Sequence, residues 1–332
     1  MKPIPKVCLK IAVCFYLLLV FGYLQGQTVF DFSREAVKER LDRDVRVLSH
    51  DSLMGREAGT KHEKIAANYI ASAFIEASLI PVGFHYVHPF YLENHRKPYH
   101  NVYGFMDNGA PKTIVVGAHY DHIGTGWSVK NDHSEMLIFN GADDNASGVA
   151  AMLELARFLT SIDTLRYNYL FVAFGAEEKG LLGSKHFTSE SLTESFNVVA
   201  MINFDMVGRF GAYKDKLIVY GTGTSPQWRR ILRQHNPHKP RLRKIGYAMS
   251  FSDHAPFYEN YIPYLFFSTG LHPEYHTADD IYETINFEGL ADVVLYTRLL
   301  ALTIDQEKKP VFREVSLLQR IGGSVFSLFM ML

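Results

Sequence analysis

Apolar, strand-like runs alternate with helix-like segments along the chain from residue 113 onward. The run "TIVVGAHY" at 113–120 precedes an amphipathic segment at 148–162, and the apolar run at 167–178 precedes a helix-like segment at 181–190. The alternation continues to a long helical segment that begins at about residue 286. This order is typical of α/β folds, and strands that read as continuous apolar runs are those covered on both faces. The sequence therefore predicts an α/β domain with a largely parallel sheet.

The N-terminal segment differs in composition from the rest of the chain. Lysines within the first ten residues precede the apolar run "IAVCFYLLLVFGYL", which is typical of a secretory signal. We expect residues 1–26 to be a signal peptide that is removed on export to the periplasm or the exterior. The alternative is an uncleaved membrane anchor, although the apolar run is short for a spanning helix.

Both cysteines, Cys8 and Cys14, lie within this segment. If it is removed, the mature protein has no thiolate, so any metal ion must be held by His, Asp and Glu side chains. No internal repeat or inserted domain interrupts the remainder of the 332-residue chain. We expect one domain at 27–310, which is long enough for a single large core, followed by a C-terminal tail of unknown role at 311–332.

The charges of the chain are nearly balanced. Lys and Arg number 34 and Asp and Glu number 35, which gives a net charge of −1 at pH 7. No strong field therefore favours binding to nucleic acid or to an anionic membrane, and no stable protein partner is implied. The one basic run, at 229–244, is interpreted as a solvated helix end and loop.

Ionisable side chains gather at the ends of the predicted strands. The ends of parallel strands meet at one edge of an open α/β sheet, where such folds bind their ligands. Each residue alone has an ordinary explanation, such as a loop cap or an acidic helix N-terminus, but the set together predicts a site. Its members are His119, Asp121, Asp143, Asp144, Glu177, Glu178, Asp205, His272, His276, Asp279 and Asp280.

The residue types in this set indicate a metal centre. Imidazoles and carboxylates without thiolates suit Zn²⁺ or a similar divalent ion. Two His and three carboxylates are too many for one open catalytic zinc, and they fit two cations about 3.5–4 Å apart that share a carboxylate and a water. Asp143 would then face the metal, with Asp144 orienting its neighbourhood. Asp121, close behind His119, suits the carboxylate that fixes the tautomer of a ligating imidazole.

Six motifs in a fixed order resemble the co-catalytic di-zinc aminopeptidase family, which includes bacterial leucyl aminopeptidase and, more distantly, the glutaminyl cyclases. They are "GAHYDHIG", "GADDNASGV", "GAEEKGLLGS", "NFDMVGR", "SDHAPF" and "YHTADD". The resemblance covers roughly residues 45–305. It implies that 27–310 is a single di-zinc peptidase domain in which a mixed sheet is sandwiched between helices.

The resemblance also implies roles for individual residues. One zinc ion would be held by one pair of ligands, a second zinc ion by another pair, and Asp143 would bridge them, with a cis peptide bond to Asp144. Glu177 would be the general base, and Asp121 would support the first ligand. The two pairs are His119 with Asp205 and Glu178 with His276.

The expected activity is that of a zinc-dependent exopeptidase that hydrolyses N-terminal residues, bulky apolar ones preferred, from peptides with a free N-terminus. Glu177 would take a proton from the metal-bridging water and pass it to the leaving amine. Alternatives are a glutaminyl cyclase on the same scaffold, a carboxypeptidase or dipeptidase, and a binding module, which would be expected to lack Glu177 or a ligand. Only Arg209 is close enough in sequence to hold a C-terminal carboxylate.

Several neighbours of the motifs are candidates for substrate contact. Tyr247 is a candidate hydrogen-bond donor to the tetrahedral intermediate. The loop at 124–140 is expected to line the entrance of the site, where Trp127 and Phe139 serve either as substrate contacts or as loop packing. The residues expected to form an apolar wall are Met206, Phe251 and Tyr275, with core packing as the alternative for Met206.

Overall fold

The computed structural model describes residues 30–92, 97–130, 133–189, 192–213, 215–234 and 240–315. The predicted signal peptide and residues 316–332 of the predicted tail lie outside the described residues. The described residues from Phe32 onward form one compact unit. Among the described helices, none combines the length and the apolar composition that a membrane-crossing segment requires.

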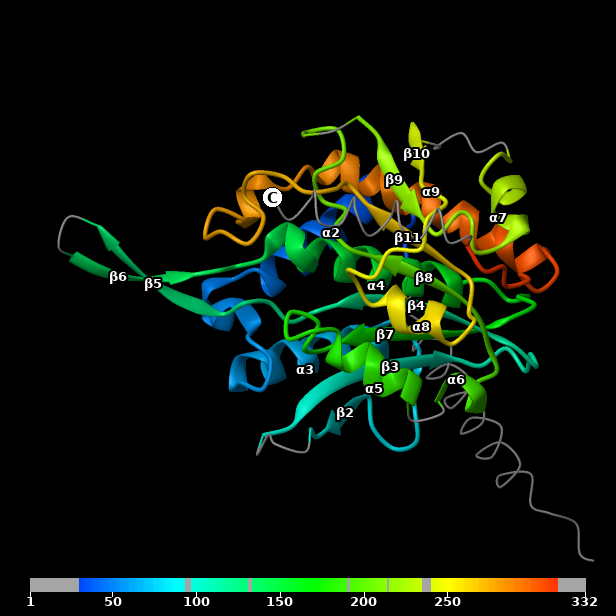
Figure 1. Ribbon diagram of the computed structural model, residues 1–332, viewed down its shortest axis with the longest axis horizontal. Helices are drawn as coiled ribbons and strands as arrows, with labels where there is room; N and C mark the ends of the chain where they lie inside the picture. The colour runs from blue at the N-terminus through cyan, green and yellow to red at the C-terminus, as the bar shows by residue number, and fades with distance from the viewer. Residues whose placement is uncertain are drawn as a thin grey trace, which may run out of the picture. The chain divides into compact units, whose positions relative to one another are not determined.

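A large mixed sheet runs through this unit in the order β1-β3-β7-β4-β8-β11-β9-β10, with β2 paired to β3 (Figure 1). The central strands β7, β4, β8 and β11 are mutually parallel, whereas β3 and β9 run antiparallel to their neighbours β7 and β11. The predicted α/β fold with a mixed, largely parallel sheet is confirmed. The strands of this sheet are β1 (Ile80–Pro81), β2 (Val87–Phe90), β3 (Tyr99–Met106), β4 (Thr113–His119), β7 (Asn168–Phe174), β8 (Val198–Phe204), β9 (Leu217–Tyr220), β10 (Leu242–Lys244) and β11 (Tyr264–Ser268).

Helices cover both faces of the sheet. Side chains of β4 alternate between two cores: Ile114 and Val116 pack with α2, α3, α4 and α9, and Val115 packs on the other face with α5 and α8. Because both faces are covered, every residue of β4 is buried. The helices are α2 (Arg34–Leu48), η1 (Asp51–Arg56), α3 (Lys61–Glu76), η2 (Ala142–Ser147), α4 (Gly148–Thr160), α5 (Leu182–Ser189), α6 (Leu192–Ser195), α7 (Pro226–Ile231), α8 (His254–Glu259), η3 (Tyr282–Thr284) and α9 (Phe287–Gln306).

The loop expected to line the entrance forms a separate hairpin. Strands β5 (Thr125–Lys130) and β6 (His133–Ile138) pair antiparallel and extend away from the large sheet, at the left of Figure 1. Trp127 is 75% exposed on it, and the ring of Phe139 lies against Gly126. None of its described residues lines the pocket beside the ionisable cluster, so Phe139 is loop packing and the expected role at the entrance is not supported.

The first residues of the predicted tail lie against the domain. The backbone N–H of Arg313 donates to the carbonyl of Thr224 at 2.8 Å, and Val315 is only 3% exposed. Residues 311–315 therefore belong to the packed unit.

Candidate metal centre and active site

The predicted ionisable residues converge at the carboxyl ends of the central strands. His119 is the last residue of β4, Glu177 and Glu178 follow β7, and Asp205 follows β8. The turn after β11 supplies His276, and η2 supplies the aspartate pair. Because these strands are parallel neighbours, their ends form one edge of the sheet, which is where such folds place ligands.

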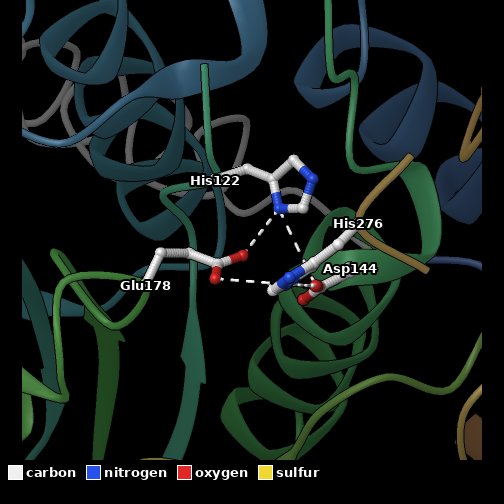
Figure 2. Close-up of side chains that lie close together, drawn as sticks. All are labelled: His122, Asp144, Glu178 and His276. Atoms are coloured by element: carbon white, nitrogen blue, oxygen red, sulfur yellow. Dashed lines mark hydrogen bonds and ion pairs between the residues drawn. The ribbon is translucent and has the colours of Figure 1, made fainter. Parts of the chain in front are cut away.

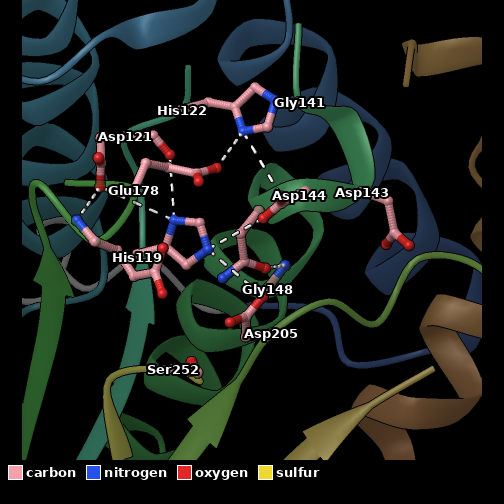
Figure 3. Close-up of polar contacts among 12 residues, drawn as sticks. His119, Asp121, His122, Gly141, Asp143, Asp144, Gly148, Glu178, Asp205 and Ser252 are labelled. Atoms are coloured by element: carbon pink, nitrogen blue, oxygen red, sulfur yellow. Dashed lines mark hydrogen bonds and ion pairs between the residues drawn. The ribbon is translucent and has the colours of Figure 1, made fainter. Parts of the chain in front are cut away.

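Three side chains form a first group of donor atoms. Nε2 of His119 lies 3.1 Å from Oδ1 of Asp144 and 3.5 Å from Oδ1 of Asp205 (Figure 3). The donor atoms of these three residues lie close enough together to hold one metal ion.

Four side chains form a second group (Figure 2). Nε2 of His276 lies 3.0 Å from Oδ2 of Asp144 and 3.1 Å from Oε2 of Glu178. Nδ1 of His122 lies 2.8 Å from Oε1 of Glu178 and 3.8 Å from Oδ2 of Asp144. The two oxygens of Glu178 are thus divided, one facing each imidazole.

Asp144, and not Asp143, stands between the two groups. Its Oδ1 faces the first group and its Oδ2 the second. The carboxylate of Asp143 points elsewhere: Oδ1 accepts from Gly208 N at 2.6 Å and from Ser147 Oγ at 2.8 Å, and Oδ2 lies 3.2 Å from Nε2 of His272. The prediction that Asp143 is shared by the two metal sites is therefore wrong, and the adjacent residue, Asp144, has that position. Hydrogen bonds from Gly208 and Ser147 turn the side chain of Asp143 away from both groups.

The backbone around the aspartate pair is anchored by a third aspartate. The cis peptide bond joins Asp144 to Asn145, rather than Asp143 to Asp144 as expected, and a second cis bond joins Asp205 to Met206. The buried carboxylate of Asp280 accepts from the backbone N–H groups of Asp143, at 2.9 Å, and Asp144, at 3.0 Å. Asp280 therefore has a structural role, anchoring the turn that presents Asp144.

Asp121 supports His119 in a different way from that expected. Its backbone carbonyl lies 3.2 Å from Nδ1 of His119, whereas its Oδ1 lies 3.9 Å from that atom. Oδ1 instead accepts a hydrogen bond from the backbone N–H of Glu177 at 2.9 Å. Asp121 therefore connects the end of β4 to the glutamate pair.

A buried arginine joins the two halves of the site, and the sequence analysis did not identify it. Arg56 is 1% exposed, and its guanidinium donates only to backbone carbonyls. Nε donates to Tyr120 O at 2.8 Å, the two terminal nitrogens donate to Asn140 O at 2.6 Å and Gly141 O at 3.0 Å, and a further bond reaches Leu48 O. Arg56 thus ties the chain after His119 to the turn that precedes Asp144.

Burial and neighbouring charges shift the pKa values of the site residues. Burial would raise the pKa of Asp144, yet hydrogen bonds from His119 and His276 hold this pKa well below its ordinary value. Burial opposes protonation of His276, but the carboxylates of Asp144 and Glu178 raise its pKa to about 10. Burial raises the pKa of Glu177 well above its ordinary value, against the charge of His119.

The donors fit zinc by type and spacing. Ligands at about 2.0–2.1 Å from a tetrahedral zinc ion stand about 3.3 Å apart. The nitrogen–oxygen distances within the two groups that are given above run from 2.8 to 3.8 Å and so bracket that value. Nε2 of His276 is buried without a well-aligned hydrogen-bond partner among the described residues, although two carboxylate oxygens lie near it. An imidazole lone pair aimed between carboxylates is the arrangement of a metal ligand.

His122 was not predicted from the sequence. The signal for it is its place in "HYDH", directly after Asp121 and three residues after His119, but a lone histidine in a loop has many ordinary roles. Its ring packs against Gly141, at which an added Cβ would lie 2.6 Å from ring carbons. Absence of a side chain at Gly141 therefore makes room for the imidazole beside Glu178.

A pocket of about 570 Å³ opens beside both groups. Met206, Phe251 and Tyr275 line it, as expected for an apolar wall, together with Tyr220 and Phe266. Glu177, Glu178, Asp205 and His276 form its polar side. Tyr247 does not line this pocket, so its expected hydrogen bond to a reaction intermediate is not supported.

Comparison with known proteins gives a consistent family relationship. The model of a family described as Peptidase family M28 matches residues 101–300. Aminopeptidase YwaD of Bacillus subtilis is 33% identical over 215 residues, which are 60% of this chain and 43% of YwaD. A probable leucine aminopeptidase of Trichophyton verrucosum is 28% identical over 228 residues, covering 61% of this chain and 56% of that protein. The chain spans about half the length of these curated relatives.

Solved structures share the fold. BSAP, a zinc aminopeptidase from Bacillus subtilis, has a TM-score of 0.64 at 20% identity, covering 87% of this chain and 100% of that one. LapA aminopeptidase of Legionella pneumophila has a TM-score of 0.62 at 24% identity, covering 86% and 79%. Glutaminyl cyclase of Porphyromonas gingivalis has a TM-score of 0.62 at 20% identity, covering 81% and 98%. Likeness at these identities establishes the fold alone.

Proposed function

Because this chain belongs to peptidase family M28, we propose that it is a zinc-dependent exopeptidase that removes N-terminal residues from peptides. The observation that carries the proposal is the carboxylate of Asp144, with Oδ1 3.1 Å from Nε2 of His119 and Oδ2 3.0 Å from Nε2 of His276. One carboxylate between two groups of donors is the arrangement that a pair of cations about 3.5–4 Å apart requires.

The two groups define the proposed ligands. His119 and Asp205 would hold one ion, Glu178 and His276 the other, and Asp144 both, while His122, the remaining member of the second group, lies 2.8 Å from Oε1 of Glu178. When bound, two zinc ions would lower the pKa of the attacking water and provide positive charge beside the scissile carbonyl. The nitrogen and oxygen donors favour zinc, and BSAP, which shares the fold, is described as a zinc aminopeptidase.

Glu177 is the proposed general base. It lines the pocket but belongs to neither donor group. The hydrogen bond from its backbone N–H to Asp121 fixes the chain at this point, while Glu178 turns towards the imidazoles. The Glu177 carboxylate is therefore free to take a proton from the attacking water and return it to the amine that leaves.

The surroundings of the pocket favour an N-terminal over a C-terminal specificity. Neither Arg nor Lys is among the described residues that line the pocket. Arg209, the candidate for binding a C-terminal carboxylate, instead donates to Glu274 at 3.1 Å and to the carbonyl of Thr284 at 2.8 Å. A pocket with carboxylates on one side and aromatic rings on the other suits a free α-amine and a bulky apolar first side chain.

Export remains part of the proposal and is supported by the sequence alone. Lysines followed by an apolar run within residues 1–26 are typical of a cleaved signal. Mass spectrometry of the native protein should give a start near Gln27. An intact Met1 in a membrane fraction would instead support the anchor.

Activity on matched substrates tests the proposal. Leucine amide should be hydrolysed, N-acetyl-leucine amide should resist, and a chelator should abolish activity that zinc restores. Glu177→Gln should lower kcat by about 10²–10⁴-fold with zinc content unchanged, whereas Glu283→Gln, at an exposed position, should change neither. Equal cleavage of free and acetylated substrates would refute the aminopeptidase assignment. Cyclisation of N-terminal glutamine without peptide cleavage would identify a glutaminyl cyclase instead.

A further inference from the structure

The imidazole of His272 is buried, and each of its ring nitrogens faces a carboxylate. Nε2 lies 3.2 Å from Oδ2 of Asp143, and Nδ1 lies 2.9 Å from Oε2 of Glu274. Burial opposes protonation of His272, but these two carboxylates raise its pKa. The sequence placed His272 among the ionisable residues of the site, yet it belongs to neither group of donor atoms. Its position between two carboxylates therefore calls for a different role.

The contacts of this imidazole extend to the loop after β8. Oε2 of Glu274 also accepts a hydrogen bond from Nη2 of Arg209 at 3.1 Å, and Nη1 of Arg209 donates to the carbonyl of Thr284 at 2.8 Å. At the other end, Oδ1 of Asp143 accepts from the backbone N–H of Gly208 at 2.6 Å. We call this connected set of side chains the brace: Asp143, Arg209, His272 and Glu274.

The brace joins the three loops that carry proposed metal ligands outside β4 and β7. One end directly precedes Asp144 in η2, and Arg209 comes from the loop that begins with Asp205. The other end lies in the turn after β11 that carries His276. No member of the brace belongs to either donor group. Any effect of the brace on metal binding therefore acts through the ligands that it positions.

His276 is the proposed ligand that most needs such support. Its side chain is 36% exposed, against at most 14% for the other members of the two donor groups. Its φ of 56° is a left-handed backbone conformation, which is unfavourable for a residue with a Cβ atom and persists only where the surroundings impose it.

The backbone around His276 is hydrogen-bonded to the brace. The N–H of Tyr275 donates to the carbonyl of His272 at 3.1 Å, and the N–H of Thr277 donates to the carbonyl of Glu274 at 3.0 Å. The residues on both sides of His276 are thus held by two members of the brace. Because the side chains of those two members are fixed to η2 and to the loop after β8, the unfavourable conformation of His276 is fixed as well.

We propose that His272 is a positioning residue whose imidazole, through the brace, fixes the loop that presents His276 to the second group of donors (Figure 2). This inference rests on the zinc ligands of the proposed function. Loss of the brace should weaken binding of the ion that His276 holds. The shared ligand Asp144 should stay in place, because Asp280 anchors its turn without His272.

Four variants test the proposal. His272→Ala removes the centre of the brace, and Glu274→Ala removes its outer end at a side chain that is 28% exposed, where folding is less at risk. Glu274→Gln is the conservative counterpart, because its amide oxygen can still accept from His272 and Arg209. Glu307→Ala is the matched control, since Glu307 is also partly exposed and paired with an arginine, Arg230, but lines no part of the active-site pocket.

The measurement is a stepwise zinc titration against a competing chelator, with His276→Ala identifying the step that belongs to the second group. His272→Ala and Glu274→Ala should weaken that step about tenfold and leave the other step unchanged. Glu274→Gln should keep most of the affinity, and Glu307→Ala should match the native protein. Unchanged steps in both alanine variants of the brace, equal weakening of both steps, or equal losses in Glu274→Gln and Glu274→Ala would overturn the proposal.

The titration needs no substrate, so its outcome is independent of peptidase activity. If the loss is confined to one step in a protein that cleaves no peptide, the role of His272 stands and the proposed function fails. If leucine amide is hydrolysed while both zinc steps are unchanged in His272→Ala and Glu274→Ala, the proposed function stands and the role of His272 is refuted.

Discussion

Replacement of Arg56 by methionine should destabilise the protein and weaken its metal centre together. Four hydrogen bonds from a buried, charged donor, at about 1.5 kcal/mol each, contribute about 6 kcal/mol. Burial lowers the pKa of Arg56 to about 10, which corresponds to a penalty of about 3 kcal/mol that methionine would not carry. Arg56→Met should therefore lower the free energy of unfolding by about 3 kcal/mol.

The assay is urea denaturation of the metal-free protein, followed by zinc titration of the folded variant against a competing chelator. Zinc affinity should fall, because Arg56 joins the carbonyl of Tyr120, next to one ligand, to that of Gly141, in the turn that presents Asp144. Arg298→Met is the matched control, since Arg298 is also buried but pairs with Glu154, away from the site. It should destabilise the fold without changing zinc affinity. A change below about 1 kcal/mol in Arg56→Met, or equal zinc affinities in both variants, would refute the reasoning.

Three further outcomes are expected. In a stepwise titration, His122→Ala should weaken binding of one zinc ion by about 10–100-fold and leave binding of the other unchanged. Unchanged affinity for both ions would show that His122 has no role at the metal centre. Gly55→Ala should cost more than about 2 kcal/mol in urea denaturation, because its Cβ would lie 2.3 Å from Gly124 O, whereas Gly83→Ala, at a similar positive φ but with nothing within 4 Å, should cost less. Phe251→Ala should lower kcat/KM for leucine amide by about tenfold but hardly affect alanine amide, and equal losses would exclude Phe251 from the substrate pocket.

Local pattern was sufficient for the architecture and for most of the site. Continuous apolar runs marked β4, β7 and β8, and the ionisable residues that follow them meet because parallel strands end at a common edge. His119, Glu178, Asp205 and His276 therefore fall into the donor groups without knowledge of the loops between them.

What escaped sequence reasoning depends on contacts between distant segments. The choice between Asp143 and Asp144 depends on the loop after β8, 65 residues along the chain, where the backbone N–H of Gly208 donates to Oδ1 of Asp143. Asp280, more than 130 residues along the chain, accepts both backbone N–H groups and anchors the turn. Two adjacent aspartates point in opposite directions in such a turn, and nothing in "GADDN" states which one faces the strand ends. Arg56 gave no signal for a related reason, since its partners are backbone carbonyls, which every sequence contains.

The basic run shows the same limit at the surface. Its residues were interpreted as a solvated helix end, and its described Arg and Lys residues are indeed exposed. Only the approach of Arg313 to Gly223 encloses them in a groove. Composition therefore indicated the charge, and tertiary packing supplied the concave shape.

The zinc content of two neighbouring variants tests the central claim most directly. Asp144→Asn and Asp143→Asn should each be loaded with zinc, freed of excess metal by gel filtration and analysed for zinc per chain by mass spectrometry. The account predicts that Asp143→Asn keeps about two zinc ions per chain, because asparagine can still accept the hydrogen bonds from Gly208 and Ser147. Asp144→Asn should lose both, since its carboxylate faces both groups of donors. Retention of two ions by Asp144→Asn with their loss from Asp143→Asn would contradict it.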